Sequence, residues 1–126
     1  MEFKEQIVYW LNSAEHDLET AESLYSSRKF DWCLFLGHLV LEKAIKAAYI
    51  YENQEDFPPK THNLVRLMKK TALPADDDLI FWLDQVNDFH LEVRYPDFRN
   101  EFYKRCTAEF AETQFLKIKE TFSWIK

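Results

Sequence analysis

The sequence predicts an all-α fold: an up-and-down antiparallel bundle of four long helices plus one short helix, forming a single domain over residues 1–126. Gly37 is the one glycine among 126 residues, so the sequence lacks the glycines that tight β-hairpin turns usually need. Apolar residues recur at spacings of three and four along most of the chain, which is typical of amphipathic helices. Hydrophobic residues make up 47% of the composition, enough for a chain of this length to bury one core.

Two long helices are expected in the first half of the chain. The first is amphipathic, because apolar residues spaced by three and four run from Phe3 to Leu24 with polar residues between them. Residues 26–29 interrupt that pattern, and Asp31 is a suitable N-cap for a second helix. The stretch from Trp32 to Leu41 is apolar on nearly all sides, so this second helix should lie at the centre of the bundle. The pair Pro58-Pro59 marks the main loop that follows it.

The second half of the chain predicts one short and two long helices. Thr61 is a plausible N-cap for the short helix, which Pro74 closes. The three acids at 76–78 suit the N-terminal end of a fourth helix, because carboxylates are favourable near a helix N-terminus. Pro96 should end the fourth helix by pushing the preceding residue toward extended geometry. The last helix is expected from about Asn100 to Ile125.

Charge and apolar patterning exclude several classes of protein. The formal net charge is −6 and basic residues are dispersed among acidic ones, which argues against tight non-specific binding to a nucleic-acid backbone. The longest uncharged run, Trp32 to Leu41, is far shorter than the ~20 residues of a membrane-spanning helix. No signal-peptide pattern opens the sequence. Cys33 and Cys106 form no CxxC pair and lie in apolar helical patterns, so we expect reduced, buried thiols and a cytoplasmic location.

The motifs of several common catalytic sites are missing. A di-iron bundle needs Glu-x-x-His pairs, but none of the residues three before a histidine is acidic. These four residues are Ser13, Phe35, Pro59 and Asn87. Phosphate-binding loops need several glycines, and the zincin pattern H-E-x-x-H is absent. His38 and Glu42 are the one His-acid pair at i,i+4, which a helix-helix hydrogen bond explains as well as a site does. We therefore expect no metal and no cofactor.

Three local motifs together carry a family resemblance. They are Glu42-Lys43-Ala44-Ile45-Lys46-Ala47, Thr61-His62-Asn63-Leu64 and Arg94-Tyr95-Pro96-Asp97. The first helix adds Trp10, Ala14, Asp17-Leu18 and Ala21 at matching spacings. In order and spacing, these motifs resemble the HEPN family over nearly the whole chain. The resemblance implies a helical bundle that pairs as a homodimer, often with a small nucleotidyltransferase encoded on a separate chain and sometimes as a toxin-antitoxin system.

The resemblance also implies a test for catalysis, since many HEPN members are metal-independent ribonucleases. Those members carry an Arg, four to six residues and then a His, so that Arg stabilises phosphate charge and His transfers protons. Counting from Arg94, the three allowed positions hold Arg99, Asn100 and Glu101, and no histidine follows His90. We therefore predict no catalytic residue of the family type. Where the family often has glutamine, this chain has Leu39, so a polar contact is replaced by packing.

The residues that match the family motifs are the candidates for binding a nucleotide or a partner. They are Glu42, Lys43, Lys46, His62, Arg94, Tyr95 and Asp97. Each has a structural alternative. Glu42 and Lys46 could form a helix-surface ion pair worth ~0.3–0.5 kcal/mol. His62 could serve local loop structure, and Arg94 could pair with Asp97.

Three functional hypotheses follow. The first is a non-catalytic HEPN-type homodimer that binds a nucleotidyltransferase chain, with a nucleotide or RNA in the dimer cleft. The second is a ribonuclease without the usual histidine, in which Arg94 acts with Glu101, Tyr95 or His90. The third is a small-molecule pocket lined by Trp32, Tyr49 and Trp82, residues that a core explains more simply.

Overall fold

The computed structural model describes residues 3–54, 57–94 and 96–126, and the side chains of residues 91–99 lie outside this description. Four long helices are present within these ranges, and two shorter ones accompany them. The helices are α1 (Phe3–Ser26), α2 (Phe30–Asn53), α3 (Leu64–Lys69), α4 (Asp77–Arg94), α5 (Pro96–Arg105) and α6 (Ala108–Ile125). The all-α prediction and the four long helices are confirmed.

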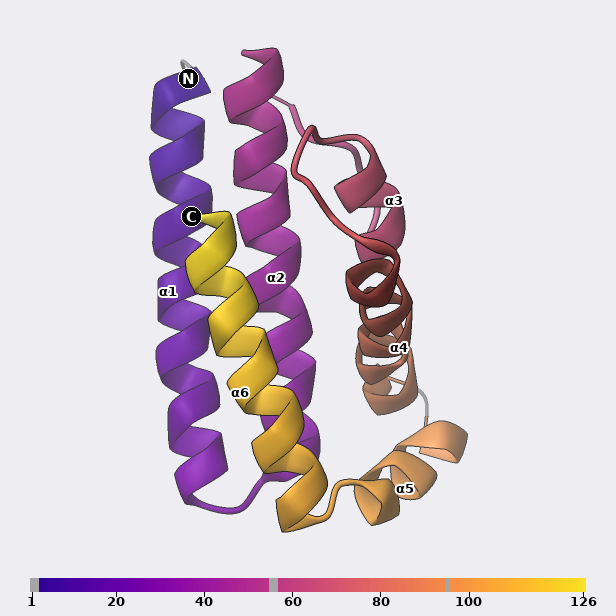
Figure 1. Cartoon of the computed structure of the whole chain (residues 1–126). Coiled ribbons are helices and arrows are strands. Elements are labelled where there is room, and N and C mark those ends of the chain that lie inside the picture. The colour runs from indigo at the N-terminus through magenta and orange to yellow at the C-terminus, as the bar shows by residue number, and fades with distance from the viewer. Residues whose placement is uncertain (1–2, 55–56, 95) are drawn as a thin grey trace.

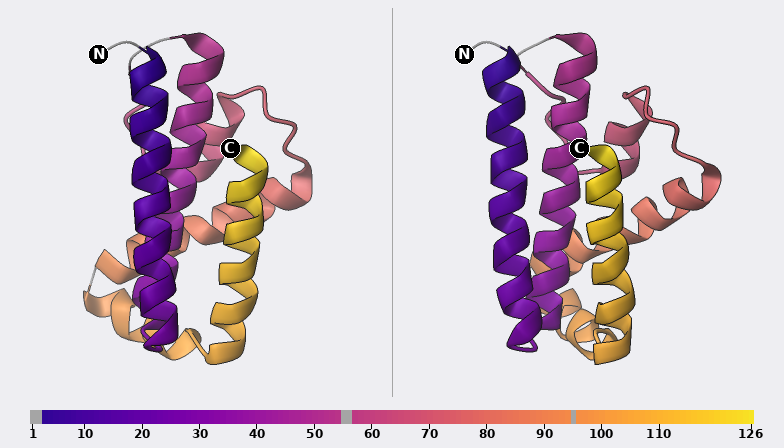
Figure 2. Two further views of the ribbon diagram at one scale, coloured as in Figure 1. Left: turned by 90° about the vertical axis from the view of Figure 1, so that its left-hand side faces the viewer. Right: turned by 60° about the vertical axis from the view of Figure 1, so that its left-hand side comes forward.

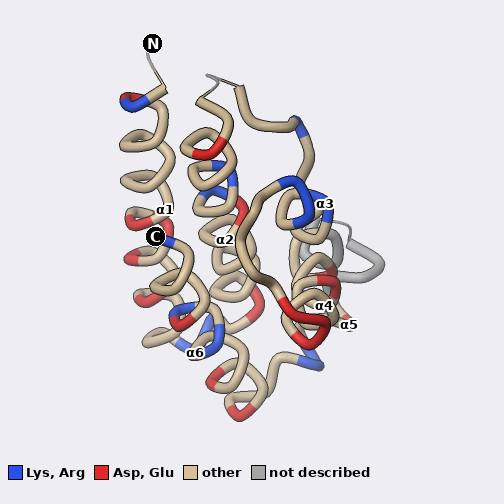
Figure 3. Tube along the Cα trace, turned by 45° about the horizontal axis from the view of Figure 1, so that its top comes forward, with Lys and Arg blue, Asp and Glu red and all other residues tan. Residues whose placement is uncertain are grey.

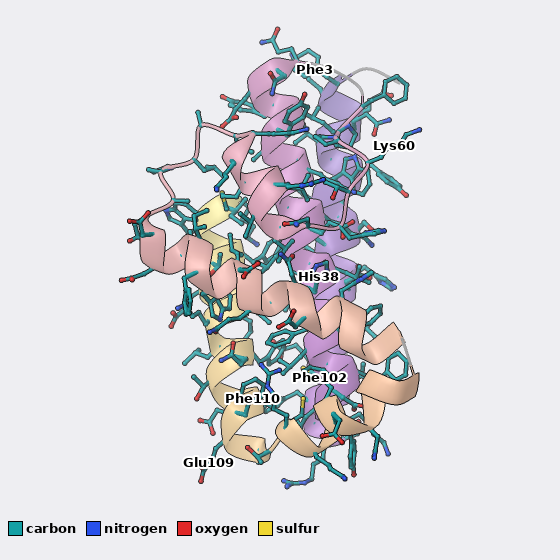
Figure 4. The ribbon with its side chains drawn as sticks, turned by 90° about the vertical axis from the view of Figure 1, so that its right-hand side faces the viewer. Phe3, His38, Lys60, Phe102, Glu109 and Phe110 are labelled. Carbon is teal, nitrogen blue, oxygen red and sulfur yellow. The ribbon has the colours of Figure 1, made fainter. Side chains whose placement is uncertain are left out.

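The helices form an elongated bundle built on an antiparallel hairpin of α1 and α2 (Figure 1). The turn between them is tight, with Arg28 in the left-handed region (φ 63°) and the Lys29 amide donating to the Leu24 carbonyl at 2.8 Å. From the far end of α2 the chain returns through α3, α4 and α5, and α4 crosses α2 obliquely (Figures 2 and 4). Helix α6 then runs beside α2 in the same direction, because α3 to α5 have carried the chain back.

Helix α2 occupies the centre of the fold, as its nearly uniform apolar sequence predicted. It contacts all five other helices, and α1 packs mainly against it. Its buried positions face every direction around the helix. They include Cys33, Leu34, Gly37, Val40, Leu41, Ala44, Ile45, Ala47 and Ile50. Burial on all sides means that any polar group in the middle of α2 needs a partner inside the protein.

The close packing of α2 against α6 depends on Gly37. A Cβ atom at this position would lie 2.6 Å from Cδ1 of Ile118, a fully buried side chain of α6. We expect Gly37→Val to lower the free energy of unfolding by about 1–3 kcal/mol, since extra methyl groups overpack a filled core. Urea denaturation measures this loss. In a double-mutant cycle with Ile118→Ala, the two substitutions should be less destabilising together than the sum of the single losses. If the losses of the two single variants simply add, the contact between residue 37 and Ile118 does not limit the packing of α2 against α6.

Two of the predicted helix caps are wrong. Helix α2 begins one residue before the expected cap, so Asp31 lies in its first turn and is buried, while the N-cap residue Lys29 makes no side-chain cap bond. The N-cap of α3 is Asn63, whose Oδ1 accepts from the amides of Val65 and Arg66 at 3.0 and 3.2 Å. Thr61 instead accepts from the Asn63 amide at 3.1 Å and so supports the cap from two residues upstream.

The expected last helix is in fact two helices. Pro96 begins α5, consistent with the preference of proline for the first turn of a helix, and α5 ends at Arg105. Thr107 then caps α6, because its Oγ1 accepts from the amide of Phe110 at 3.1 Å. The break separates two packing directions: Phe102 of α5 is fully buried against Phe89 of α4, whereas α6 packs on α2. One continuous helix could not pack against α4 and α2 in these two directions.

Other composition-based predictions hold in the described residues. Cys33 and Cys106 are both buried, and burial raises the pKa of the Cys33 thiol to about 12, so this residue carries its proton at neutral pH. In the described part of the chain, no helix is long and apolar enough to cross a membrane. Figure 3 shows basic residues on α3 and acidic residues at the start of α4.

Candidate functional site

A buried carboxylate on α2 organises the most polar cluster of the interior. Glu42 is 4% exposed, and each of its two oxygens has a partner. Oε2 accepts from Nζ of Lys46 at 3.0 Å, one turn further along α2. Oε1 accepts from Nδ1 of His62 at 2.8 Å, which comes from the segment before α3. The predicted Glu42–Lys46 pair therefore exists, but it is buried and bridged to His62 instead of lying on a helix surface.

His38 fixes the backbone of the same segment. Its Nε2 donates to the carbonyl oxygen of His62 at 2.9 Å, because a carbonyl can only accept. In a neutral imidazole this bond leaves Nδ1 without a proton. Nδ1 is buried 3.9 Å from Oε1 of Glu42 and has no hydrogen-bond partner in the described structure. Figure 4 shows His38 on α2 beside the crossing of α4.

Burial keeps His38 neutral. Loss of hydration lowers the pKa of its imidazole from 6.5 to about 4, and the nearby Glu42 carboxylate offsets only part of that effect. His38 is fully buried, whereas the side chain of His62 is 59% exposed. The two histidines that meet Glu42 are thus in very different environments, one closed to solvent and one open to it.

A row of flat rings leads from this cluster along α2. The His90 ring of α4 lies over the His62 ring, with centroids 4.7 Å apart and planes 21° from parallel. His90 also meets His38 at 4.8 Å and Phe35 at 5.3 Å. The Phe35 ring in turn meets Trp32, whose side chain reaches the surface, edge-on at 5.9 Å. This ring row (Trp32, Phe35, His90 and His62) joins an exposed indole to the exposed imidazole.

The structure brings together three of the seven predicted site residues: Glu42, Lys46 and His62. Lys43 faces the opposite side of α2, where its Nζ binds Oδ2 of Asp17 at 2.6 Å and Oγ of Ser13 at 2.8 Å. Lys43 therefore joins α1 to α2 and does not belong to the cluster. The three remaining predicted residues and the alternative pair among them lie outside the described side chains. These are Arg94, Tyr95 and Asp97.

Sequence reasoning missed two members of the cluster. His38 was considered only as a partner of Glu42, whereas its bond goes to a carbonyl 24 residues away. His90 was expected in the core or an interface, or as a helper of Arg94 in the ribonuclease hypothesis, and it is half-buried in contact with three other rings. The available signal was the spacing of His38 and Glu42 by one helical turn. Among the described residues, no group of three or more acidic, histidine or cysteine side chains could hold a metal ion.

A second surface feature is an apolar groove of about 360 Å³ between α1, α2, Leu73 and the C-terminal end of α6. Helix α6 stops partway along α1 and α2, so their far halves lack its cover (Figure 1). The alanines Ala44, Ala47 and Ala48 line the groove together with Tyr51, whose side chain is 70% exposed. The predicted small-molecule pocket does not coincide with it: Trp82 is 4% exposed, and its Nε1 donates to Gln114 at 2.8 Å.

Comparison with known proteins gives two matches. The model of the HEPN domain matches residues 7–126. Among solved structures, the crystal structure of TT1696 from Thermus thermophilus superposes with a TM-score of 0.79, covers 95% of both chains and is 19% identical in sequence. At that identity the likeness concerns the fold. No curated protein sequence matches this chain.

Proposed function

This chain belongs to the HEPN domain family, and from that premise we propose that it is a non-catalytic, homodimeric binding and assembly protein of the cytoplasm. Its partner chain is a minimal nucleotidyltransferase, in the manner of a toxin-antitoxin pair. A nucleotide or RNA segment occupies a cleft of the dimer.

The observation that carries this proposal is the amount of apolar surface left over after the core is filled. Every long helix keeps large hydrophobic side chains at the surface, although the interior is closely packed. They are Val8, Tyr9, Trp32, Tyr51, Phe57, Phe81, Tyr103, Leu116 and Trp124. Where exposed apolar side chains gather into one patch, the patch typically marks a protein interface. The groove beside Tyr51 is where we place the second copy of the chain, since it combines small floor residues with an exposed aromatic rim.

The polar cluster supports the ligand part of the proposal. Flat rings at the surface give a stacking platform for a nucleobase, and the ring row has an exposed ring at each end, Trp32 and His62, with two partly buried rings between them. Helix α4 supplies His90 to this row, and Arg94 follows one turn later on the same helix. A ligand on the ring row would therefore lie within one helical turn of the position of Arg94.

The test of assembly compares two aromatic residues of equal exposure. Tyr51 at the groove and Phe81 on α4 are 70% and 69% exposed. We expect Tyr51→Ser to weaken the dimer by about tenfold or more, because aromatic anchors dominate interface energies, and Phe81→Ser to leave it unchanged. Sedimentation velocity over a concentration series measures both. A monomeric wild-type chain, or equal effects of the two variants, would contradict the proposed dimer face.

Co-expression with a candidate nucleotidyltransferase, followed by native mass spectrometry, tests the proposed partner chain.

The alternative proposal, a ribonuclease built on Arg94, is decided by a separate assay. Of its suggested helpers, Glu101 is exposed on α5, while His90 is half-buried among other rings. Single-stranded RNA is incubated with the wild-type chain and with Arg94→Ala in the presence of a chelator. Cleavage that disappears in the variant supports the ribonuclease, and intact RNA beside a stable dimer supports the binding protein.

A further inference from the structure

We propose that His62 is a nucleophile toward carboxylic esters, with Glu42 as the positioning residue that orients its imidazole. This activity is separate from dimerisation and from the proposed partner. It uses one side chain exposed to solvent and one buried carboxylate behind it, both within a single chain.

His62 is held in place although most of its side chain is exposed. Nδ1 donates to Glu42 at 2.8 Å, and the His90 ring lies over the imidazole at 4.7 Å. The backbone at the same residue is fixed by the bond from His38 to its carbonyl oxygen, at 2.9 Å. Two side-chain contacts and one backbone contact, made by α2 and α4, therefore restrict a side chain that would otherwise sample several rotamers. A reacting group that is already oriented loses less entropy in the transition state.

The hydrogen bond to Glu42 also selects the tautomer. A carboxylate only accepts, so the neutral His62 ring carries its proton on Nδ1 and keeps a lone pair on Nε2. Nε2 has no hydrogen-bond partner among the described residues, and the ring around it faces solvent. The Glu42 carboxylate is held in this orientation, because Nζ of Lys46 binds its other oxygen at 3.0 Å and the Glu42 side chain is only 6% exposed. A nucleophile, a partner that orients it and a group that fixes the partner form the usual arrangement of an activated side chain.

The reaction that this geometry allows has two steps. In the first, the Nε2 lone pair attacks the ester carbonyl carbon, a C–N bond forms, and the C–O bond breaks as the oxygen of the leaving group takes the electron pair and departs as an alkoxide or phenolate. The ring keeps its Nδ1 proton, and the positive charge of the resulting acyl-imidazolium is balanced by Glu42. In the second, water attacks the acyl carbon, and the C–N bond breaks as its electron pair returns to Nε2. One proton of the water stays on the carboxylic acid and the other passes through solvent to the alkoxide, so the sum is ester plus water giving acid plus alcohol.

The ring row indicates the class of ester. His90, Phe35 and Trp32 continue from His62 through stacked, tilted and edge-on ring contacts, and Trp32 is 36% exposed. A flat aromatic group can stack on such a surface while its ester carbon meets Nε2. Esters of small carboxylic acids with aromatic leaving groups therefore fit this site.

The experiment uses p-nitrophenyl acetate as the probe and His62→Asn as the key variant. The asparagine Nδ2 takes the position of the imidazole Nδ1, so the bond to Glu42 is kept while the nucleophile is lost. His16, an exposed histidine of α1, provides the matched control as His16→Gln. We expect release of p-nitrophenolate to fall about tenfold or more in His62→Asn, to fall partly in Glu42→Gln, and to stay unchanged in His16→Gln.

Two results would overturn the proposal. One is a His62→Asn protein that melts like the wild type and cleaves the probe equally fast. The other is a wild-type rate that falls as much in His16→Gln as in His62→Asn, which is what unassisted imidazoles would give. A further measurement uses the wild-type chain alone: the reaction is quenched with acid during turnover, and the acetyl group is located by mass spectrometry of proteolytic peptides. The proposal requires acetyl on the peptide that contains His62, and acetyl on other peptides only would contradict it. A monomeric chain that passes these tests would refute the dimer proposal without affecting this one.

Discussion

Replacing Glu42 with leucine is expected to lower the free energy of unfolding by about 3–5 kcal/mol, one of the two largest effects we predict for this chain. The substitution removes the acceptor of Lys46, which is 7% exposed, and leaves its ammonium group buried without that carboxylate. It also releases His62 and with it the segment before α3. Urea denaturation followed by circular dichroism measures the loss.

The double variant Glu42→Leu with Lys46→Met separates buried charge from lost packing. If the unpaired ammonium causes most of the loss, the double variant should recover stability to within about 1–2 kcal/mol of the wild type, because an apolar pair of similar volume often replaces a buried ion pair at little cost. A double variant as unstable as Glu42→Leu would show instead that the bond to His62 dominates. A Glu42→Leu loss below about 1 kcal/mol would mean that Lys46 reaches solvent in solution.

Stability should fall as the pH is lowered from about 6.5 to about 4, and the buried His38 should be a main cause. The unfolded chain binds a proton on this residue below about pH 6.5. The folded chain does so only near pH 4, because burial lowers the pKa. In this window the unfolded state holds more protons, so acid favours unfolding, and the effect levels off below pH 4. The total contribution of His38 is about 3 kcal/mol.

His38→Gln is the matched control for this pH dependence. The glutamine Nε2 can donate to the His62 carbonyl oxygen as the imidazole Nε2 does, but it does not titrate. Unfolding free energies of both proteins are compared between pH 7 and pH 4. The wild type should lose about 3 kcal/mol more than the variant over that range, since carboxylates titrate in both. Parallel curves would show that His38 binds its proton in the folded state as easily as in the unfolded one.

Much of the fold could be predicted from the sequence because it follows from local patterns. The stretch from Trp32 to Leu41 is apolar on nearly all sides, and this pattern predicts a central helix. The limits of α1 and α4 follow from apolar spacing, from the acids at 76–78 and from Pro96. Local signals failed where two residues compete for one role. Asn63 and Thr61 are both good helix caps, and the structure uses Asn63. Local signals also failed at Thr107, because the apolar spacing continues through this residue although the chain changes direction there.

The candidate site was only half visible in the sequence. The motifs singled out Glu42, Lys46 and His62, but they placed Lys43 in the same group, although it binds Asp17 on α1. Nor could they show that the Glu42–Lys46 pair is buried, or that His38 and His90 meet His62.

By itself, then, the sequence determined which segments are helical, which helix is central and which family the chain resembles. Only the tertiary structure decided which polar side chains share one environment. The physical reason is that helix periodicity fixes the direction of a side chain relative to its own helix axis, whereas its partners depend on how α3 and α4 cross α2. Contacts between residues 20 or more positions apart, such as Glu42 with His62, arise from that crossing.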